Sequence, residues 1–163
     1  MTLKEAIKEI EALRLEIERV KGISEVHPLS GLQNLTAFQR RCGDIERLSH
    51  YMVVFVDLDG LKAVNDTQGH DVGDVVIQQL AKGLRKYFRY KDVYHIYGDE
   101  FVVIYRCNGG LVGIEERMDG LTKGCEGVCE FSYGVGSDKN FLSAYRHAEA
   151  EMRRMKVVKK ALR

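Results

Sequence analysis

The segment Tyr51–Asp57 constrains the fold most strongly, because it is an almost continuous apolar run that ends in a carboxylate. The run is rich in β-branched residues and too short for a buried helix, so it predicts a strand covered on both faces. A strand of this kind requires neighbouring strands and helices that shield it. The segment therefore predicts a sheet with helices packed against it.

The rest of the chain alternates between helical and strand patterns. The predicted helices cover residues 2–22, 34–48, 111–122 and 141–162, with a further helix that opens after a Gly69–Gly73 loop and turns Val72, Val76, Leu80 and Leu84 inward. The predicted strands cover 51–57, 93–96, 101–105 and 128–135, and residues 97–100 form an acidic hairpin tip. This order predicts an α+β (α/β-type) sandwich of the split βαβ kind, with a ferredoxin-like sheet and flanking helices.

The N-terminal helix carries an apolar seam flanked by Lys, Glu and Arg, and Gly22 is expected to end it. The seam consists of Leu3, Ala6, Ile10, Leu13, Ile17 and Val20. Its period of about 3.5 residues is typical of a short coiled coil. Two arrangements remain open: an amphipathic helix that folds back on its own domain, and a stalk that joins two copies. The predicted boundaries are 1–24 for this helix and 25–163 for the domain.

Composition excludes several classes of function. The 163 residues suit a single domain, and 25 Lys and Arg against 24 Asp and Glu leave a net charge of +1, which argues against nucleic-acid binding. No apolar run reaches the roughly 20 residues of a membrane span, and the charged start lacks the apolar core of a signal peptide. The cysteines, which are too few for a disulfide framework, are expected to be free thiols: Cys42, Cys107, Cys125 and Cys129. The sequence predicts a cytoplasmic domain without a membrane partner.

Carboxylates gather at the ends of two predicted strands. Asp57 and Asp59 end the first strand, where alternate residues point the same way, and Asp99 and Glu100 lie on the hairpin tip. If the hairpin pairs beside the first strand, these carboxylates meet at one edge, and their mutual repulsion requires bound cations. Hard oxygen ligands favour Mg²⁺ or Mn²⁺, and Mg²⁺ commonly shares its ligand shell with substrate phosphates. The alternative is that Asp59 and Glu100 are solvated turn residues.

Several motifs, met in order along the chain, resemble those of GGDEF domains, the diguanylate cyclases. The run DLDGLKAVNDTQGHDVGD at 57–74 is similar to the family signature DxDxFKxxNDxxGHxxGD, and YGDEF at 97–101 is similar to the GGDEF hairpin. The motifs LTGLxN, SxGV and ADxAMYxAK resemble LSGLQN at 29–34, FSYGV at 131–135 and AEAEMRRMK at 148–156. The resemblance implies a palm-like fold that condenses two GTP into cyclic di-GMP with loss of two pyrophosphates.

Matched position by position, the resemblance also implies roles for the acidic residues. Asp57 and the Leu58 carbonyl match metal ligands. Asp99 and Glu100 match residues that bind metal and take part in catalysis, with Glu100 beside the activated 3′-hydroxyl. The implied cofactor is Mg²⁺ or Mn²⁺, and the implied substrate is GTP.

A second group of residues matches the nucleotide site of the family. Asn65 and Asp74 match the readers of guanine, and a carboxylate suits that role because it accepts from both guanine N–H groups. The other nucleotide-binding positions are Gly60, Leu61, Gly98, Lys156 and Lys160. Lys156 and Lys160 lie one helical turn apart, although an ordinary cationic helix end explains them as well. Two GTP-loaded protomers must face each other, which favours the dimerising stalk.

The chain departs from the family pattern around the hairpin. Tyr97 replaces the first glycine of the motif, where a phenol is expected to crowd the nucleotide. His27 and Leu35 replace a family Asp and Arg, and His95 stands where the family has Arg. Gly98, Asp99, Glu100 and Phe101 of the motif remain, which still favours a metal-dependent diguanylate cyclase that works as a homodimer. The alternatives are a GTP-binding or interaction domain that lost turnover through Tyr97, and a related cyclase with a different cyclic dinucleotide product.

The product-inhibition motif of the family, RxxD, is not matched in register. Its positions fall on Phe88 and Lys91, whereas Arg89 and Asp92 read RxxD one residue closer to the hairpin. An inhibitory product site at Arg89 and Asp92 therefore stays open.

Overall fold

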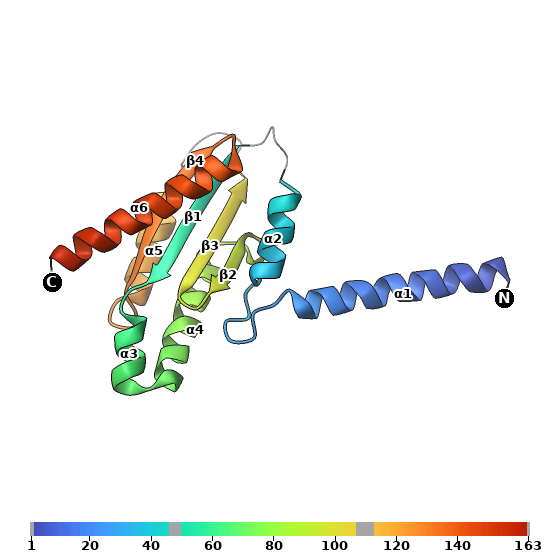
Figure 1. Cartoon of the computed structure of the whole chain (residues 1–163), viewed down its shortest axis with the longest axis horizontal. Coiled ribbons are helices and arrows are strands. Elements are labelled where there is room, and N and C mark those ends of the chain that lie inside the picture. The colour runs from blue at the N-terminus through green and yellow to red at the C-terminus, as the bar shows by residue number, and fades with distance from the viewer. Residues whose placement is uncertain (1, 46–49, 107–112, 163) are drawn as a thin grey trace.

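The computed structural model of the chain describes residues 2–45, 50–106 and 113–162. A long N-terminal helix, α1 (Leu3–Ser24), precedes a domain in which helices cover a four-stranded sheet (Figure 1). The strands are β1 (Tyr51–Leu58), β2 (Val93–Tyr97), β3 (Glu100–Arg106) and β4 (Phe131–Asp138). The helices of the domain are α2 (Leu35–Gly43), α3 (Leu61–Gln68), α4 (His70–Tyr87), α5 (Ile114–Cys125) and α6 (Phe141–Ala161), with a short 3-10 helix, η1 (Tyr90–Asp92), before β2.

The sheet has the strand order β2-β3-β1-β4, and β1 is antiparallel to both of its neighbours. Pairing with β3 places Asp57 opposite Glu100, and pairing with β4 places Tyr51 opposite Asp138. The predicted α+β fold with a split βαβ sheet is confirmed. Because β1 and β3 are antiparallel, the end of one strand and the start of the other lie at the same edge, where the sequence carries its carboxylates.

The strand β1 is buried along its whole length, as the sequence predicts. Its alternate side chains enter two apolar cores on opposite faces of the sheet. One core joins Met52, Val54, Val56 and Leu58 to residues of α4 and α5, and the other joins Tyr51, Val53 and Phe55 to residues of α2 and α6. These helices cover the two faces of the sheet, so its polar residues lie at the ends of the strands.

Two glycines of β4 allow α6 to lie directly on the sheet. A Cβ atom at Gly134 would stand 2.1 Å from the Ala148 carbonyl oxygen, and one at Gly136 would stand 1.9 Å from the Ala144 carbonyl oxygen. Both distances are impossible for real atoms, so only glycine permits this approach. The close packing fixes where the C-terminal half of α6 lies relative to the end of β1.

The structure corrects several predicted boundaries. The predicted Gly69–Gly73 loop is wrong: residues 61–68 form α3, Gly69 makes the turn with a φ of 90°, and Gly73 is buried inside α4. Val72 is correspondingly exposed rather than inward. Helix α2 already ends at Gly43, and residues 46–48 of its predicted C-terminal part lie outside the described residues. Glycine is favoured at a helix end where φ is positive, as at Gly69, whereas Gly73 keeps helical geometry inside α4, so the two glycines of the motif have different roles.

The remaining boundary shifts are smaller. Helix α1 continues through Gly22 to Ser24. Helix α5 spans 114–125 rather than 111–122, and residues 111 and 112 lie outside the described residues. The last strand begins at Phe131, because Val128 belongs to a turn in which its N–H donates to the Cys125 carbonyl oxygen at 2.9 Å.

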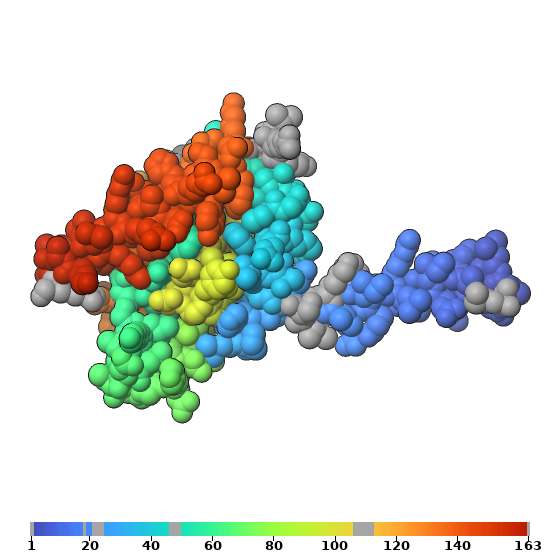
Figure 2. Space-filling view, in the orientation of Figure 1, coloured from blue at the N-terminus to red at the C-terminus, as the bar shows by residue number. Residues whose placement is uncertain are grey.

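Helix α1 extends away from the sheet and presents its apolar seam to solvent (Figures 1 and 2). Ile10 is 51% exposed and Leu13 is 57% exposed. The helix therefore does not fold back on its own domain in this structure, and the 1–24 and 25–163 boundaries stay a prediction. None of the helices in the described ranges combines the length and the apolar character that crossing a bilayer requires.

The cysteines for which the structure gives a state agree with the predicted free thiols. Cys125 is buried, while Cys42 and Cys129 are partly buried, and all three are unbridged. Cys107 lies outside the described residues.

Candidate active site

The predicted carboxylates meet where β1 ends and β3 begins. Asp57 is the last acidic residue inside β1, and Glu100 is its cross-strand partner in β3. The backbone N–H of Leu58 donates to the Asp99 carbonyl oxygen at 3.0 Å, which ties the hairpin tip to the end of β1. The antiparallel register therefore brings together three of the four acidic residues that the sequence predicts at this edge.

The electrostatics of this group disfavour negative charge in the absence of a cation. Burial raises the pKa of Asp57, the hydrogen bond from Lys156 lowers it, and the charges of Asp99 and Asp59 raise it again. Burial also raises the pKa of Glu100, followed by the charges of Asp57 and Asp99. Carboxylates that raise one another's pKa in this way are poised to bind a cation.

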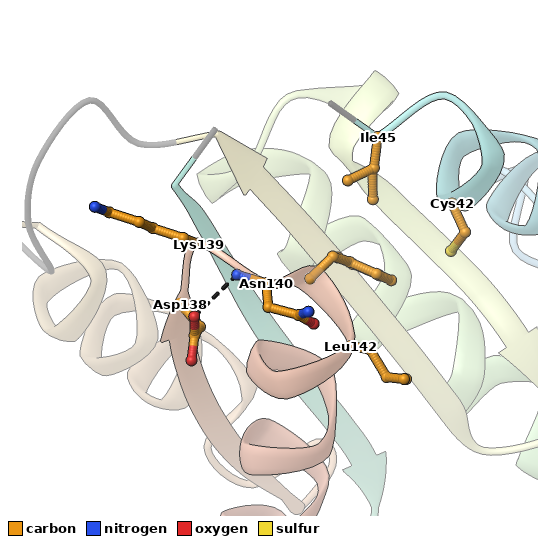
Figure 3. A pocket seen from close by; sticks show the side chains of 7 residues that line it. Cys42, Ile45, Asp138, Lys139, Asn140 and Leu142 are labelled. Atoms are coloured by element: carbon orange, nitrogen blue, oxygen red, sulfur yellow. Dashed lines mark hydrogen bonds between the residues drawn. The ribbon is translucent and has the colours of Figure 1, made fainter. Parts of the chain in front are cut away.

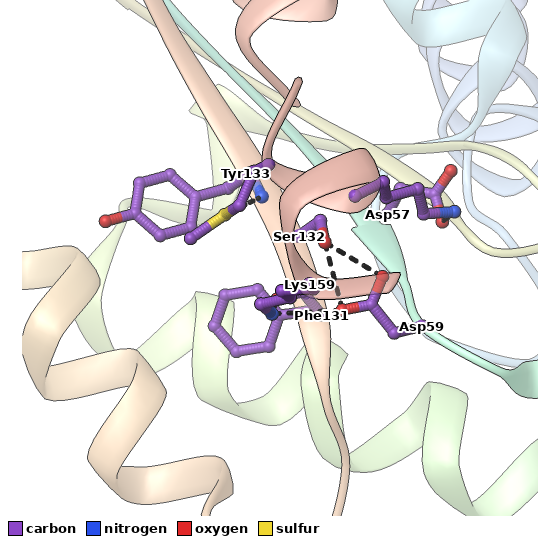
Figure 4. Close-up of polar contacts among 8 residues, drawn as sticks. Asp57, Asp59, Phe131, Ser132, Tyr133 and Lys159 are labelled. Carbon is purple, nitrogen blue, oxygen red and sulfur yellow. Dashed lines mark hydrogen bonds and ion pairs between the residues drawn. The ribbon is translucent and has the colours of Figure 1, made fainter. Parts of the chain in front are cut away.

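The side chains of two α6 lysines extend to the end of β1 from the face of the sheet that α6 covers. The Lys156 ammonium forms an ion pair with Asp57. The Lys159 ammonium lies 3.0 Å from Asp59 Oδ2 and 2.5 Å from the Phe131 carbonyl oxygen (Figure 4). The C-terminal part of α6 thus supplies positive charge to the acidic edge, and the close contact of α6 with the β4 glycines places it there.

Asp59 is the exception among the predicted carboxylates. It lies beyond the end of β1, and its two carboxylate oxygens accept from the Ser132 hydroxyl at 2.9 and 3.0 Å (Figure 4). Together with the Lys159 ion pair, these bonds engage the Asp59 carboxylate, whose side chain is only 8% exposed. Asp59 therefore joins the strand end to β4 and α6, and its part in a cluster of four carboxylates stays a prediction.

Lys159 is the site residue that the sequence reasoning missed. The prediction chose Lys156 and Lys160 as one face of the last helix, but the structure turns Lys156 and Lys159 toward the sheet and leaves Lys160 exposed. Residues three apart share a helix face as well as residues four apart, so the spacing alone did not discriminate between them. The role of Lys160 stays a prediction.

The predicted guanine readers lie in the hairpin of α3 and α4. The side chain of Asn65 packs against Gly73, where a Cβ atom would stand 1.9 Å from Asn65 Oδ1. That Oδ1 atom is buried and has no hydrogen-bond partner in the described part of the chain. A buried acceptor without a partner costs free energy unless a ligand donates to it. Asp74 follows Gly73 directly and is exposed.

The turn between β1 and α3 is shaped for a phosphate. Gly60 has a φ of 75°, a left-handed conformation that favours glycine, and it caps the N-terminus of α3. No side chain caps this terminus, so the first N–H groups of α3, beginning with Leu61, are available. Free amides at a helix N-terminus bind phosphate groups.

The hairpin tip carries the main departure from the family pattern. The Tyr97 side chain is 58% exposed and follows an irregularity in the pairing of β2 with β3. Gly98 adopts a conformation in which a Cβ atom would meet nothing within 4 Å. The effect of Tyr97 on a bound nucleotide stays a prediction.

The two residues of the shifted RxxD pattern bind each other. Arg89 Nε lies 2.7 Å from Asp92 Oδ2 across η1, and Asp92 is buried. The pair therefore has a local structural role in closing this turn before β2. A second role as an inhibitory product site stays a prediction.

The acidic edge fits a Mg²⁺ ion that is completed by its substrate. Within the described ranges, no group of three or more Asp, Glu, His or Cys side chains stands close enough to hold a metal by itself. Mg²⁺ is usually bound by one or two carboxylates together with substrate phosphates, rather than by a full protein cage. Asp57 and Glu100 offer hard oxygen donors of this kind, and the ion pair of Asp57 with the Lys156 ammonium shows that the place attracts a cation. The Leu58 carbonyl as a further ligand stays a prediction.

A hollow on the domain surface lies away from the acidic edge. It has a volume of about 650 Å³ and opens between the end of α2 and the start of α6, lined by Cys42, Ile45 and residues 138–142 (Figure 3). Asp138 pairs with Tyr51 at the opposite end of β1 from Asp57. The hollow therefore does not belong to the acidic site.

The sequence profile described as diguanylate cyclase, GGDEF domain, matches residues 25–157. The chain belongs to this GGDEF family. Among curated relatives, the GGDEF chain is 39% identical over 71 residues to diguanylate cyclase DgcZ of Escherichia coli, which is 43% of this chain and 24% of DgcZ. It is 35% identical over 107 residues to diguanylate cyclase VdcA of Vibrio cholerae, which is 63% of this chain and 31% of VdcA. The matched part thus spans less than a third of either relative.

The fold of the GGDEF chain also agrees with solved structures. The crystal structure of the coiled coil and GGDEF domain of DgcB from Caulobacter crescentus, in complex with c-di-GMP, superposes with a TM-score of 0.73 at 22% identity. The match covers 93% of this chain and 90% of that one. Diguanylate cyclase SiaD of Pseudomonas aeruginosa gives a TM-score of 0.71 at 21% identity over 94% of this chain and 68% of that one. At these identities the likeness concerns the fold alone.

Proposed function

We propose that this GGDEF domain is a Mg²⁺-dependent diguanylate cyclase that joins two GTP molecules into cyclic di-GMP and releases two pyrophosphates. The observation that carries the proposal is the pairing of Asp57 with Glu100 beside the Lys156 ammonium. This arrangement combines oxygen ligands, a general base and a phosphate-binding cation at one strand end. GTP as substrate implies that the domain faces the cytoplasm.

The guanine is bound by the hairpin of α3 and α4. The Asn65 side chain contacts the base, and the exposed Asp74 carboxylate accepts from N1–H and the exocyclic amino group. Adenine lacks the N1–H donor and carries its amino group at another position, so these acceptors favour GTP over ATP. The amides at the start of α3 bind the phosphates, with Gly60 and Leu61 at the turn.

The chemistry takes place at the acidic edge. Asp57, Glu100, Asp99 and the Leu58 carbonyl would hold Mg²⁺, which neutralises charge on the triphosphate and lowers the pKa of the attacking hydroxyl. When GTP binds, the Lys156 ammonium leaves its ion pair with Asp57 and binds a phosphate oxygen instead. Glu100, whose pKa is raised and which, among the described residues, has no ion pair with Lys156, accepts the proton of the 3′-hydroxyl as that oxygen attacks the α-phosphorus of the second GTP.

The reaction requires two copies of the domain, since each holds one GTP. The exposed seam of α1 supports a parallel two-stranded coiled coil, because β-branched Ile10 and Ile17 occupy one seam position and Leu13 the other. In a parallel pair, Glu9 of one helix flanks Arg14 of the second, whereas an antiparallel pair would place like charges together. We therefore propose a homodimer joined through α1.

The proposal is tested by incubating the protein with GTP and Mg²⁺ and separating the nucleotides by chromatography. We expect cyclic di-GMP and pyrophosphate from GTP, no cyclic product from ATP, and no product after chelation of the metal. Asp99→Asn is expected to lower the rate by at least about 100-fold. Asp119→Asn, on the exposed face of α5, is the matched control and should retain the wild-type rate.

Binding of GTP without any cyclic dinucleotide would contradict the proposal and favour the alternative of a GTP-binding domain without turnover. The exposed Tyr97 at the first glycine position of the motif is the feature that supports this alternative.

A further inference from the structure

His95 is buried in β2, and its ring contacts four residues: His27, Ser30, Gly98 and Phe101. It is only 1% exposed. Its ring stacks on Phe101 with a centroid distance of 4.3 Å and lies against His27 with a centroid distance of 3.8 Å. Its Nδ1 atom is 3.0 Å from the Ser30 hydroxyl oxygen, and its Nε2 atom is 3.1 Å from the Gly98 carbonyl oxygen.

The partners of the two ring nitrogens determine where the proton lies. A carbonyl oxygen can only accept, so Nε2 carries the hydrogen and donates to Gly98. In a neutral ring Nδ1 then accepts from the Ser30 hydroxyl. Burial, followed by the neighbouring His27, lowers the pKa of His95 to about 4, so the ring is neutral near pH 7. The tautomer with hydrogen on Nε2 therefore satisfies the hydrogen bonds of both ring nitrogens.

The ring is anchored on the side of the N-terminal turn, which comprises residues 27–33. The His27 N–H donates to the Leu32 carbonyl oxygen at 2.7 Å and closes this turn. The His95 backbone N–H donates to the Gln33 carbonyl oxygen at 2.7 Å and holds the turn against β2. Ser30, which binds the ring, therefore belongs to a segment that is itself fixed to the sheet.

On its other side the ring holds the peptide group that leads into Asp99. The Gly98 carbonyl belongs to the bond between Gly98 and Asp99, and it is bound by His95 Nε2. The next carbonyl, that of Asp99 itself, is bound by the Leu58 N–H at 3.0 Å. Two successive carbonyls are thus fixed from opposite directions, one by β1 and one by the His95 ring.

We propose that His95 is a positioning residue, whose neutral ring connects the N-terminal turn to the Gly98 carbonyl and thereby fixes Asp99 for metal binding and catalysis. The inference deepens the proposed cyclase activity and rests on it for its kinetic test. Its partners are the stacked ring of Phe101, the tilted ring of His27 and the hydroxyl of Ser30.

The kinetic test uses His95→Phe, which preserves a stacked ring of similar size but removes both ring nitrogens. We expect kcat for cyclic di-GMP formation to fall by about 10-fold or more, with KM for GTP within about threefold of wild type, because a displaced catalytic group affects the transition state rather than binding. His147→Phe, at an exposed position of α6, is the matched control and should match wild type. An unchanged kcat in His95→Phe would overturn the proposal.

A second measurement does not depend on turnover. In uniformly ¹⁵N-labelled protein, the imidazole signals that disappear in His95→Phe are expected to report a neutral ring with hydrogen on Nε2 at pH 7. The Asp99 backbone amide signal should move in His95→Phe and stay in place in His147→Phe. An Nδ1–H tautomer, or an unmoved Asp99 amide, would overturn the inference even if the wild-type protein were found to make no cyclic di-GMP.

Rescue by a different donor distinguishes positioning from simple core packing. The double variant His27→Asp/His95→Arg replaces the stack by an ion pair whose guanidinium can donate to the Gly98 carbonyl. We expect this variant to recover kcat to within about threefold of wild type, while His95→Arg alone stays impaired because its buried charge has no counterion. A double variant no better than the single one would contradict the proposed hydrogen bond.

Discussion

Glu100 occupies a place in the fold where its own negative charge is unfavourable. Burial raises the pKa of its carboxyl, and Asp57, Asp99 and Glu149 raise it further. Arg153 acts in the opposite direction, but it is already ion-paired with Glu149 at 2.6 Å. Without a divalent cation, the acidic edge therefore reduces the stability of the folded domain, as is common where residues are arranged for catalysis.

We predict that Glu100→Gln raises the melting temperature of the metal-free protein by about 1–3 °C at pH 8. The pKa of Glu100 is higher in the folded than in the unfolded chain, so the unfolded chain loses its proton first and wild-type stability falls as pH rises through the raised pKa. Below the ordinary value near 4.5 the carboxyl is protonated in both states, and the advantage of the variant should vanish. Thermal unfolding followed by circular dichroism between pH 4 and pH 8 measures the difference.

Glu116→Gln, on the exposed side of α5, serves as the control for loss of one negative charge and should leave the melting temperature unchanged at every pH. Millimolar Mg²⁺ should raise the melting temperature of wild type more than that of Glu100→Gln. A variant less stable than wild type at pH 8 without metal would show that Glu100 is a structural carboxylate instead.

Individual residues of the site differed in how well the sequence predicted them. Asp57 and Glu100 were predictable as neighbours, because a buried strand ending in Asp and an acidic hairpin tip meet in an antiparallel pair. Asp59 was not, since its partners Ser132 and Lys159 lie more than 70 residues away along the chain. Side-chain partners of that kind depend on which elements pack together, and strand alternation contains no information about them.

At the scale of elements, the position of α6 depends on the glycines of β4. Gly134 and Gly136 let the helix backbone approach the strand, and this approach brings Lys156 to Asp57 and Lys159 to Asp59. The packing of one helix on one strand thus determines both the stability of this face of the sheet and the charge of the acidic edge.

We predict that Gly136→Ala destabilises the protein by about 2–4 kcal/mol, because its Cβ would overlap the Ala144 carbonyl oxygen and the backbone must shift. Cyclase activity should fall as well, since a displaced α6 moves Lys156 away from the strand end. Urea unfolding at constant pH measures the free-energy change.

The matched control is Gly124→Ala in α5, where a new Cβ meets nothing within 4 Å. Alanine has the higher helix propensity, so this variant should be as stable as wild type or slightly more stable. Equal stability of Gly136→Ala and wild type would mean that α6 can shift without loss.

The pair α3 and α4 shows why helix boundaries were harder to predict than helix faces. Both glycines of the motif suggested a loop, but only Gly69 turns the chain, whereas Gly73 is buried in a helix against Asn65. Glycine serves both purposes, and only the packing partner decides which applies.

For the whole molecule, the main feature is the separation of α1 from the sheet domain. The apolar side chains of α1 are not buried against the sheet domain and stay exposed to solvent. Exposed apolar seams of this kind mark interaction surfaces. In the homodimer that we propose, a second copy of α1 would bury the seam and bring the two proposed nucleotide sites into one assembly.

We predict that Leu13→Lys/Ile17→Lys abolishes the dimer and lowers cyclase activity by at least about 10-fold at micromolar protein, because buried lysines oppose pairing of the seam. Sedimentation at several concentrations measures the mass, and the same samples are assayed for cyclic di-GMP. Leu15→Lys is the control, since Leu15 is 73% exposed but lies off the seam and should leave both properties unchanged. Full activity of a monomeric double variant would contradict the dimer.

The sequence by itself determined the buried strand, the order of the strands and of every α-helix except α3, the two acidic strand ends and the family. These features follow from local periodicity and from contiguous motifs, which are visible along the chain. Only the tertiary structure decided that Asp59 is bound by Ser132 and Lys159, that α1 extends away from the domain, and that His95 connects a distant turn to the Gly98 carbonyl. These contacts join segments far apart in sequence, so they arise from the packing of surfaces and from burial, which no local pattern records.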